Sequence, residues 1–514
     1  MSELLDTWGI TIMVFLPLVG ALIMMLVPGG DEEMHKVIAL VTTVATGVWG
    51  IIMFLPSNFD YDNTAQLQFV QDKRWIEIVN ARYTVGIDGI SMPLIALTLL
   101  VVPLVIIYSW NHIPSPGNAK AFLMLILVLH TGMLGSFVAQ DLVLFFVFFE
   151  VVLLPMYFMI GVWGGEQRMY AAIKFFLFTL FGSALMLVSF LALYWATGAE
   201  TFNMVGLAER VASEDIKLAT QVLIFGGMFL GFGIKVPMFP FHTWLPDAHT
   251  QAPTQGSVIL AAVLLKLGTY GFVRIAVPIL PEAAVEWAPV IGGLAVIGII
   301  YGALGCLAQT DMKRLIAFSS VAHMGYVMLG IATLTPFGIN AAIFGMVAHG
   351  LITGMLFFVA GSVKERFHTL EIKRLGGLLI QAPKMGWILG FTTMASLGLP
   401  GLAGFWGEFP AILAAYQPAD GVSTGLFRFY MVVAAVGTVL AAGYLLWLLQ
   451  RTAFGNPSDE FKDDPEIHDM VITEWIAWVP MLVLILVLGF APGLIFDITN
   501  DAVTASLSAI GAGQ

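Results

Sequence analysis

Long apolar runs, separated by short polar stretches, fill almost the whole chain. A helix needs about 20 mostly apolar residues to cross the hydrocarbon core of a membrane. Fourteen runs are of about this length, and we predict a transmembrane helix for each. They are 8–27, 36–55, 90–109, 121–138, 141–162, 169–196, 220–240, 253–278, 287–308, 312–332, 336–361, 384–416, 424–450 and 471–494. The pattern therefore predicts an all-α polytopic membrane protein with about fourteen transmembrane helices.

One long polar segment, 56–89, interrupts this series near the N-terminus. Polar and apolar residues alternate within it, at Gln66, Leu67, Gln68 and Phe69. Alternation with a period of two is typical of a β-strand that has one exposed face. We therefore expect a short surface hairpin in this segment.

The composition supports a membrane protein and excludes several other classes. Charged residues make up 11% of the 514 residues, whereas a soluble globular protein carries about a quarter. The net charge of −12 provides no basic surface for nucleic acid. Cys306 is the single cysteine, and one thiol cannot form an internal disulfide, hold an iron–sulfur cluster or build a zinc site. We expect no metal and no cofactor-binding site in this chain.

Positive residues are divided unequally between the two sets of loops. If the N-terminus lies outside, the inner loops hold 12 Lys and Arg residues, the outer loops hold 6, and the other four of the 22 lie within spans. Loops on the inner side of a membrane carry the excess of Lys and Arg. Both termini are therefore predicted to lie on the outer side.

Short sequences recur in the second half of the chain. Ala139-Gln140-Asp141 opens the fifth run and Ala308-Gln309-Thr310-Asp311 opens the tenth, and the offset of the two aspartates is 170 residues. Each unit contains five helices, so the second copy crosses the membrane in the opposite sense. We predict helices 1–3, two inverted five-helix repeats (helices 4–8 and 9–13) and a final helix 14. The corresponding segments are 1–120, 121–280, 287–450 and 451–514.

Proline and glycine interrupt the seventh and twelfth runs at matching places. The seventh passes through Pro237 and Pro240, and the twelfth through Gly398, Pro400 and Gly404. Proline removes a backbone donor and clashes with the preceding turn. Broken helices within inverted repeats mark the binding sites of secondary transporters. Ordinary proline kinks are the alternative explanation.

Six ionisable residues are predicted to lie near the middle of the membrane. A charge at that depth costs at least about 2.5–3.5 kcal/mol. All six side chains can bind and release a proton, which arginine cannot, and none of them is arginine. The row therefore predicts a proton relay. At each site the alternative is a structural role, as an ion pair or a hydrogen-bonded core histidine. The six are Glu150, Lys235, Lys266, His323, His349 and Glu408.

Three other polar residues within spans are given different interpretations. Lys174 lies one turn inside its span, close enough for its side chain to extend to the inner surface. Arg274 lies near the outer end of span eight, and we expect it to anchor the helix at the membrane interface. His130 in span four has no counterpart in the second repeat, so it is left out of the relay.

Several segments together resemble a known family. The run Trp244-Leu245-Pro246-Asp247-Ala248-His249 links the two lysine-bearing spans. With 266–271, 318–325 and 398–408, it resembles the antiporter-like subunits of respiratory complex I, from about span three to span fourteen. Those subunits are related to subunits of multisubunit sodium/proton antiporters. The largest of them has a long lateral helix, which we do not expect in the residues that follow span fourteen. Glutamate rather than lysine at Glu408 resembles the subunit M, or chain 4, type.

The resemblance implies a role for each of the six residues. Glu150 and Lys235 would be an interacting pair beside an input channel. Lys266, His323 and His349 would form a central hydrated chain. Glu408 would be the last proton-transferring group, near the exit.

The resemblance also implies a function and a setting. It indicates a proton-translocating subunit of NADH:quinone oxidoreductase in a bacterial inner membrane. The partners would be other membrane-arm subunits, including the sister antiporter-like subunits. FMN, iron–sulfur clusters and quinone would be bound by other subunits of the complex. One alternative is a sodium/proton antiporter subunit without a redox partner. A passive membrane scaffold is another, but it would have no reason to carry charges at mid-membrane depth.

Overall fold

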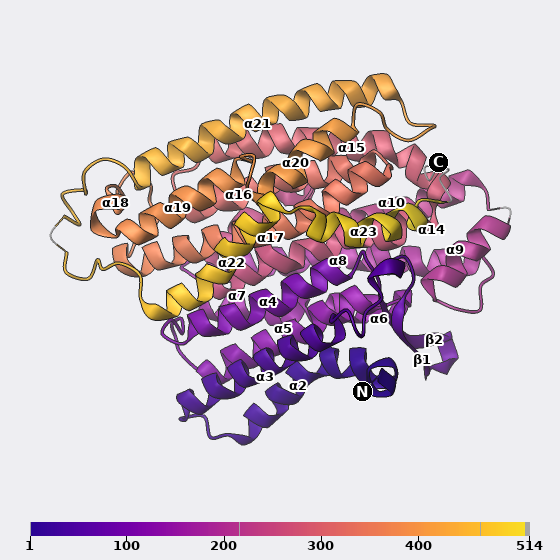
Figure 1. The fold of residues 1–514 in the computed structure, drawn as a ribbon, viewed down its shortest axis with the longest axis horizontal. Coiled ribbons are helices and arrows are strands. Elements are labelled where there is room, and N and C mark those ends of the chain that lie inside the picture. Colours follow the sequence, from indigo (N-terminus) through magenta and orange to yellow (C-terminus); the bar gives the residue numbers. More distant parts are fainter. Residues whose placement is uncertain (1, 215, 463, 509–514) are drawn as a thin grey trace.

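The structure is a computed structural model that describes residues 2–214, 216–462 and 464–508. Helices dominate this part of the chain, and most of them run side by side along the long axis of the molecule (Figure 1). Thirteen described helical segments are long and apolar enough to cross a membrane. The expected all-α multi-pass architecture is confirmed.

The bounds of the elements follow the apolar runs closely. The first helices are α1 (Ser2–Leu4), α2 (Ile10–Leu26), α3 (Glu32–Met53), α4 (Met92–Ser109), α5 (Ala119–Val138), α6 (Leu142–Val151), α7 (Leu153–Trp163) and α8 (Arg168–Ala196). The next are α9 (Met204–Ser213), α10 (Leu218–Lys235), α11 (Trp244–Gln251), α12 (Thr254–Ile259), α13 (Leu265–Gly271), α14 (Val277–Ile279), α15 (Pro281–Leu307) and α16 (Met312–Ala332). The last are α17 (Pro336–Phe367), α18 (Leu378–Gln381), α19 (Pro383–Ser396), α20 (Ala403–Ala414), α21 (Thr424–Thr452), α22 (Ile472–Phe490) and α23 (Gly493–Ser506).

The two ends of the bundle are distinguished by a β-hairpin. Strands β1 (Gln68–Ile76) and β2 (Ala81–Ile87) form it at the right in Figure 1, which we call the hairpin end. The start of α2 and the end of α23 both lie at the hairpin end (Figure 1). The opposite end, which we call the far end, carries α18 and the connection between α21 and α22. The first and last described segments of the chain therefore lie on the same side of the bundle.

The hairpin expected in the polar segment is confirmed. Its strands pair antiparallel. The Arg82 guanidinium donates to the Asp72 carboxylate at 2.6 Å, and the Thr84 hydroxyl donates to it at 2.8 Å. These hydrogen bonds, the one from Arg82 above all, hold the pKa of Asp72 below its ordinary value. A backbone bridge from Val85 to Ala139 joins the hairpin to the end of α5.

The seventh predicted helix is interrupted where its prolines lie. α10 ends at Lys235, and no α-helix resumes until α11 begins at Trp244. The backbone between them passes through Pro237 and Pro240, which cannot donate hydrogen bonds to a helix. Lys235 is thereby placed at the end of a helix inside the bundle.

The twelfth predicted helix is interrupted in the same manner. α19 ends at Ser396 and α20 begins at Ala403. Gly398 has a φ of +71°, a left-handed conformation that glycine adopts without strain. α19 and α20 have 14 and 12 residues, and each is too short to cross alone. This division explains why the described residues show thirteen long apolar helices rather than fourteen.

Three helical features differ from the predictions. The fifth predicted helix is divided at Val152 into α6 and α7, since Pro155 cannot donate to the preceding turn. The short α9 lies in the loop between α8 and α10, where no helix was predicted. The chain after span fourteen also forms a helix, α23, which packs on α17 through a Thr499–Asn340 hydrogen bond of 2.6 Å.

The starts of α6 and α16 show the same local pairing at opposite ends of the bundle. An aspartate side chain caps each helix. At the hairpin end, the N–H of Leu142 donates to the carbonyl of Phe202 at 2.9 Å. At the far end, the N–H of Met312 donates to the carbonyl of Leu370 at 2.9 Å. This match fits two inverted repeats, which remain a prediction for the units as a whole.

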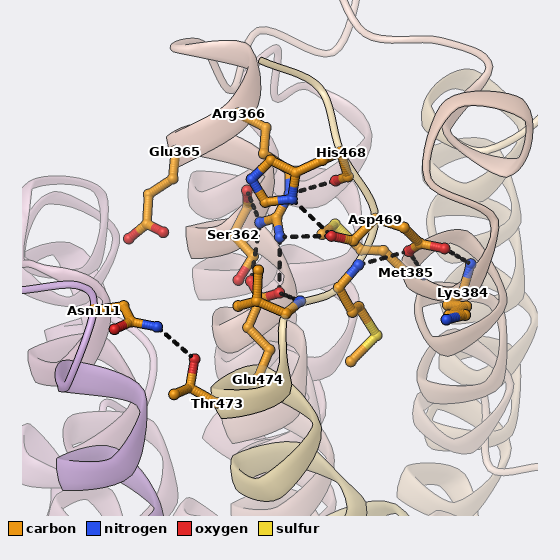
Figure 2. A network of polar contacts seen from close by, with 12 residues as sticks. Asn111, Ser362, Glu365, Arg366, Lys384, Met385, His468, Asp469, Thr473 and Glu474 are labelled. Carbon is orange, nitrogen blue, oxygen red and sulfur yellow. Dashed lines mark hydrogen bonds and ion pairs between the residues drawn. The ribbon is translucent and has the colours of Figure 1, made fainter. Parts of the chain in front are cut away.

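A buried ion pair joins α17 to α22 at the far end. Figure 2 shows Arg366 facing Glu474, with Nη1 to Oε1 at 2.9 Å and Nη2 to Oε2 at 2.8 Å. The other N–H groups of Arg366 donate to the carbonyls of His468, Asp469 and Ser362 at 2.7, 3.3 and 3.1 Å. All five guanidinium donors are thus used, and they hold the α21–α22 connection against α17.

The same connection also holds α19. The Asp469 carboxylate accepts the backbone N–H groups of Lys384 and Met385, at 3.0 and 3.2 Å, in the first turn of α19 (Figure 2). A nearby hydrogen bond of 3.1 Å joins Asn111, after α4, to Thr473 of α22. Four helices therefore converge on this network at the far end.

Replacing Glu474 with alanine is expected to destabilise the protein strongly, because Arg366 would keep a buried charge without its partner. Removal of one member of a buried pair costs about 3–5 kcal/mol. The exposed Arg374–Glu460 ion pair provides the matched control, and Glu460→Ala should leave stability unchanged. Thermal unfolding of the detergent-solubilised protein measures both. Equal losses of thermal stability in the two variants would show that the buried ion pair stabilises the fold no more than the exposed one.

Candidate functional site

Four of the six predicted site residues form one row inside the bundle. Lys266 Nζ lies 2.7 Å from His349 Nδ1, and His323 Nδ1 lies 2.5 Å from Glu408 Oε1. The two imidazole rings lie 6.2 Å apart between centroids. The row therefore passes from α13 through α17 and α16 to α20. We call these four side chains the central row.

Lys266 lies in an unusual stretch of helix. The π-helical turns Leu260–Leu264 and Phe272–Ala276 adjoin α13 on its two sides. Such turns are rare and occur frequently at functional sites. Lys266 is fully buried, and its Nζ also donates to the carbonyl of Ala261 at 2.5 Å. The ammonium group is thus held by a backbone carbonyl and an imidazole.

His323 is the most connected member of the central row. Its Nδ1 contacts Glu408, and its Nε2 lies 3.2 Å from both the Ser396 hydroxyl and the Tyr444 hydroxyl. His323, His349 and Glu408 also line a cavity with about 20 Å³ of space for water centres. A cavity needs only about 10–15 Å³ of such space to hold a water molecule. The two histidines can therefore be bridged by water.

Close packing of α20 on α17 brings Glu408 to this cavity. A Cβ on Gly407 would lie 2.5 Å from the Cα of Gly345, so no larger residue fits at this crossing. Glu408 lies within α20, after the break in the twelfth helix, whereas Lys235 lies before the break in the seventh. The two residues therefore lie on opposite sides of their respective helix breaks. The Glu408 carboxylate nevertheless approaches the break, since a Cβ on Gly398 would lie 3.3 Å from its Oε2.

Glu150 and Lys235 lie apart from the central row and do not bond directly to each other. Among the described residues, no ion pair joins Glu150 to Lys235 and no hydrogen bond joins either of them to Lys266. Lys235 Nζ instead lies over the ring of Phe149, 4.7 Å from its centroid. The carboxylate and the ammonium carry opposite charges, so each favours the ionised form of the other. The implied pair therefore makes no direct contact in this structure.

Some residues around the site were not predicted. Tyr444 and Ser396 contact His323, but neither residue type stands out in an apolar helix. His249 is fully buried, stacks on Phe357 at 4.4 Å, and has no hydrogen bond from its ring nitrogens to any described residue. It belongs to the segment that carried the family resemblance, and that signal could have found it.

A larger cavity opens at the far end of the bundle, with about 850 Å³ of space for water centres. Polar side chains from the loop after α4, from α16 and from α17 line it, including His112, Lys313 and Glu365. His112 Nδ1 lies 2.5 Å from Glu365 Oε2. The far end therefore has a polar cavity that is large enough to admit water.

The residues left out of the relay are placed by the structure as follows. Lys174 pairs with Asp247 at 2.7 Å. Arg274 is not an interface anchor, because it forms a buried ion pair of 2.5 Å with Asp88. Asp88 follows β2, a partner too distant in sequence to be predicted. His130 is buried in α5 and bonds to no polar atom of the described residues.

Two families match this chain. Residues 139–438 match the family described as NADH:quinone oxidoreductase/Mrp antiporter, TM, and residues 11–135 match NADH-ubiquinone oxidoreductase chain 4, amino terminus. The chain is 42% identical over 507 residues to NADH-quinone oxidoreductase subunit M of Rhodobacter capsulatus, covering 96% of this chain and 95% of the relative.

Two solved structures resemble this chain over nearly its whole described length. A chain of respiratory complex I from Thermus thermophilus with bound NADH has a TM-score of 0.85 at 28% identity, over 98% of this chain and 100% of that one. A chain of the Mrp complex from Dietzia sp. DQ12-45-1b has a TM-score of 0.80 at 21% identity, over 98% of this chain and 51% of that one, which is a likeness of fold. The chain belongs to the NADH:quinone oxidoreductase/Mrp antiporter family of membrane proteins and, within it, to the subunit M, or chain 4, group.

Proposed function

We propose that this chain is a proton-translocating membrane subunit of an NADH:quinone oxidoreductase. The observation that carries the proposal is the central row, in which four titratable side chains lie in sequence within the membrane-spanning part of the bundle. Lysine, histidine and glutamate can all exchange protons. Full-length similarity to a subunit M relative supports the assignment to this enzyme complex.

In this proposal, protons pass along the central row from Lys266 to Glu408. Lys266 and His349 lie 2.7 Å apart, so both carrying a positive charge is unfavourable. A proton passed from Nζ to Nδ1 leaves a neutral amine and an imidazolium. Water in the small cavity can carry the proton onward to His323. There the Glu408 carboxylate, at 2.5 Å, stabilises the imidazolium or takes its proton.

In this proposal, Glu150 controls the protonation of Lys235. The carboxylate favours the charged form of the lysine, and burial opposes it. Motion at the break after Lys235 would change the distance between the two groups and thereby the protonation of the lysine. We assign them to the input side and Glu408 to the exit.

The remaining parts of the proposal concern the assembly. Electrons pass through other subunits, which bind FMN, iron–sulfur clusters and quinone, and this chain responds by moving protons. We place it in a bacterial inner membrane with the hairpin end outside, beside other membrane-arm subunits that include its sister antiporter-like subunits. Segments 121–280 and 287–450 are the two proton-handling units.

A sodium/proton antiporter subunit is the second candidate, favoured by the shared fold of the Mrp chain. Purification from the native membrane separates the two functions. The proposed function expects a flavin-containing assembly that oxidises NADH with the quinone as acceptor. Recovery only with small membrane subunits, without NADH oxidation, would favour the antiporter.

Glu408→Gln is expected to stop pumping and to lower coupled turnover by about a hundredfold, the scale of a lost proton-transfer group. The amide keeps the size of the side chain but cannot exchange a proton. Glu408→Asp should retain part of the activity, since the cavity leaves room for water to bridge the shorter side chain to His323. The measurement is NADH-driven acidification of membrane vesicles, with Glu209→Gln on the exposed face of α9 as the matched control. Full pumping by an assembled Glu408→Gln complex would remove Glu408 from the pathway.

Glu150→Gln is expected to abolish pumping and most NADH:quinone turnover while the complex still assembles. Without the carboxylate, the charged form of the buried Lys235 loses the negative group that favours it. Glu150→Asp should be milder because it keeps the charge. Glu166→Gln, in the exposed loop after α7, is the control. Native electrophoresis checks assembly, and a normally pumping Glu150→Gln complex contradicts the role.

Lys235→Arg separates charge from proton release, because arginine keeps the positive charge and does not deprotonate. We expect pumping to be lost in this variant, as in Lys235→Ala. Lys217→Arg, at the exposed start of α10, should pump like the parent. If Lys235→Arg pumps fully, the lysine supplies only a fixed charge.

A further inference from the structure

Arg274 forms a closed polar network at the hairpin end of the helix that carries Lys266. Its Nη2 lies 2.5 Å from Asp88 Oδ1, and its Nε donates to the Tyr270 hydroxyl at 3.1 Å. That hydroxyl in turn donates to the carbonyl of Phe137 at 2.8 Å, at the end of α5. The arginine and aspartate side chains are only 12% and 5% exposed. The network therefore ties α5, the helix of Lys266 and the end of the hairpin together within the bundle.

This network lies directly in line with Lys266. Lys266, Tyr270 and Arg274 are spaced by four residues, so they share one face of the helix. At 1.5 Å per residue, the backbone of Arg274 follows that of Lys266 by roughly 12 Å toward the hairpin end. Tyr270 is fully buried between them. Tyr270 and Arg274 thus place polar side chains along this helix between Lys266 and the hairpin end, without involving either histidine.

A water path along this face of the helix would let protons bypass the proposed pathway through the central row. A proton on Lys266 that left along this face would reach the hairpin end without crossing to Glu408. The residue at the hairpin end of this face is Arg274, and arginine carries a permanent positive charge and cannot relay a proton. Fixed arginines exclude protons and cations from the narrow pores of membrane channels.

The charge of Arg274 is also fixed in position. Asp88 Oδ1 accepts the backbone N–H groups of Ile90 and Ser91, both at 3.1 Å, so the carboxylate is held by its own turn. A held carboxylate keeps the guanidinium in place over Tyr270. The mobility that would open a water path beside the arginine is therefore restricted from both sides.

We propose that the Asp88–Arg274–Tyr270 network is an electrostatic seal that prevents protons on Lys266 from leaking directly to the hairpin end. This proposal rests on the proposed function, since it takes Lys266 to carry a proton. Arg274 is a positioning and sealing residue, without a part in proton transfer itself. Its loss should change the passive leak of the membrane more than the rate of NADH oxidation.

The experiment measures proton leak through the reconstituted complex without NADH. Proteoliposomes receive a potassium diffusion potential through valinomycin, and a trapped pH dye reports proton flow. Arg274→Gln is expected to raise the passive proton flow several-fold over the parent. With NADH, quinone reduction should continue while the pH gradient reached falls. Arg210→Gln, an exposed arginine of α9 at the same end, should match the parent in both assays.

Two further variants keep the result interpretable. The double change Asp88→Asn with Arg274→Gln replaces both charges by amides of similar size, so no unpaired charge is buried and the fold is preserved. It should leak like Arg274→Gln. Adding Lys266→Ala to Arg274→Gln should return the leak toward the parental value, because the path begins at Lys266.

The outcomes separate this inference from the proposed function. Parental leak and a parental pH gradient in both charge-removing variants would overturn the seal and leave the relay untouched. A leak that persists in the variant lacking Lys266 would also overturn it, because the water path would bypass the lysine. Normal pumping by Lys266→Ala alone would instead refute the relay.

Discussion

A charge or an unpaired polar group in hydrocarbon is costly unless a nearby group compensates it. The charges of the central row and of the two buried arginines meet this requirement in different ways. Lys266 is held by a carbonyl and an imidazole, and Glu408 by His323. Arg274 is paired with the carboxylate of Asp88, and Arg366 with that of Glu474. The difference among them is chemical. The arginine pairs are fixed, whereas the central row is built of groups that can exchange their protons.

Most of the fold could be predicted from the sequence because the membrane imposes length and polarity on each helix. The breaks at Lys235 and at Gly398 lie where proline and glycine indicated them. The bend at Val152, the helix α9 and the helix α23 were not predicted. Their stability depends on contacts with distant segments, such as the bond between Thr499 and Asn340, and these contacts leave no periodic signal in the sequence.

The residues of the central row could be predicted from the sequence, but the contacts between them could not. Lys266 and His349 stand out because each is a titratable residue in an apolar run. Their 2.7 Å contact joins residues 83 positions apart and arises from the packing of α17 against the helix of Lys266. Tyr444 was missed because a tyrosine in a transmembrane helix is unremarkable. The interpretation of Arg274 as an interface anchor was wrong because its partner, Asp88, lies on another segment.

The Arg366 network at the far end has a consequence for which residues can replace one another there. The guanidinium supplies five donors in one plane, and all five have acceptors from three segments of the chain. Lysine has the same charge but only three donors on a single nitrogen. It would therefore supply at least two fewer hydrogen bonds to this buried cluster. The requirement is therefore geometric as well as electrostatic, because lysine could balance the charge of Glu474 but could not bond to all the acceptors that the guanidinium reaches.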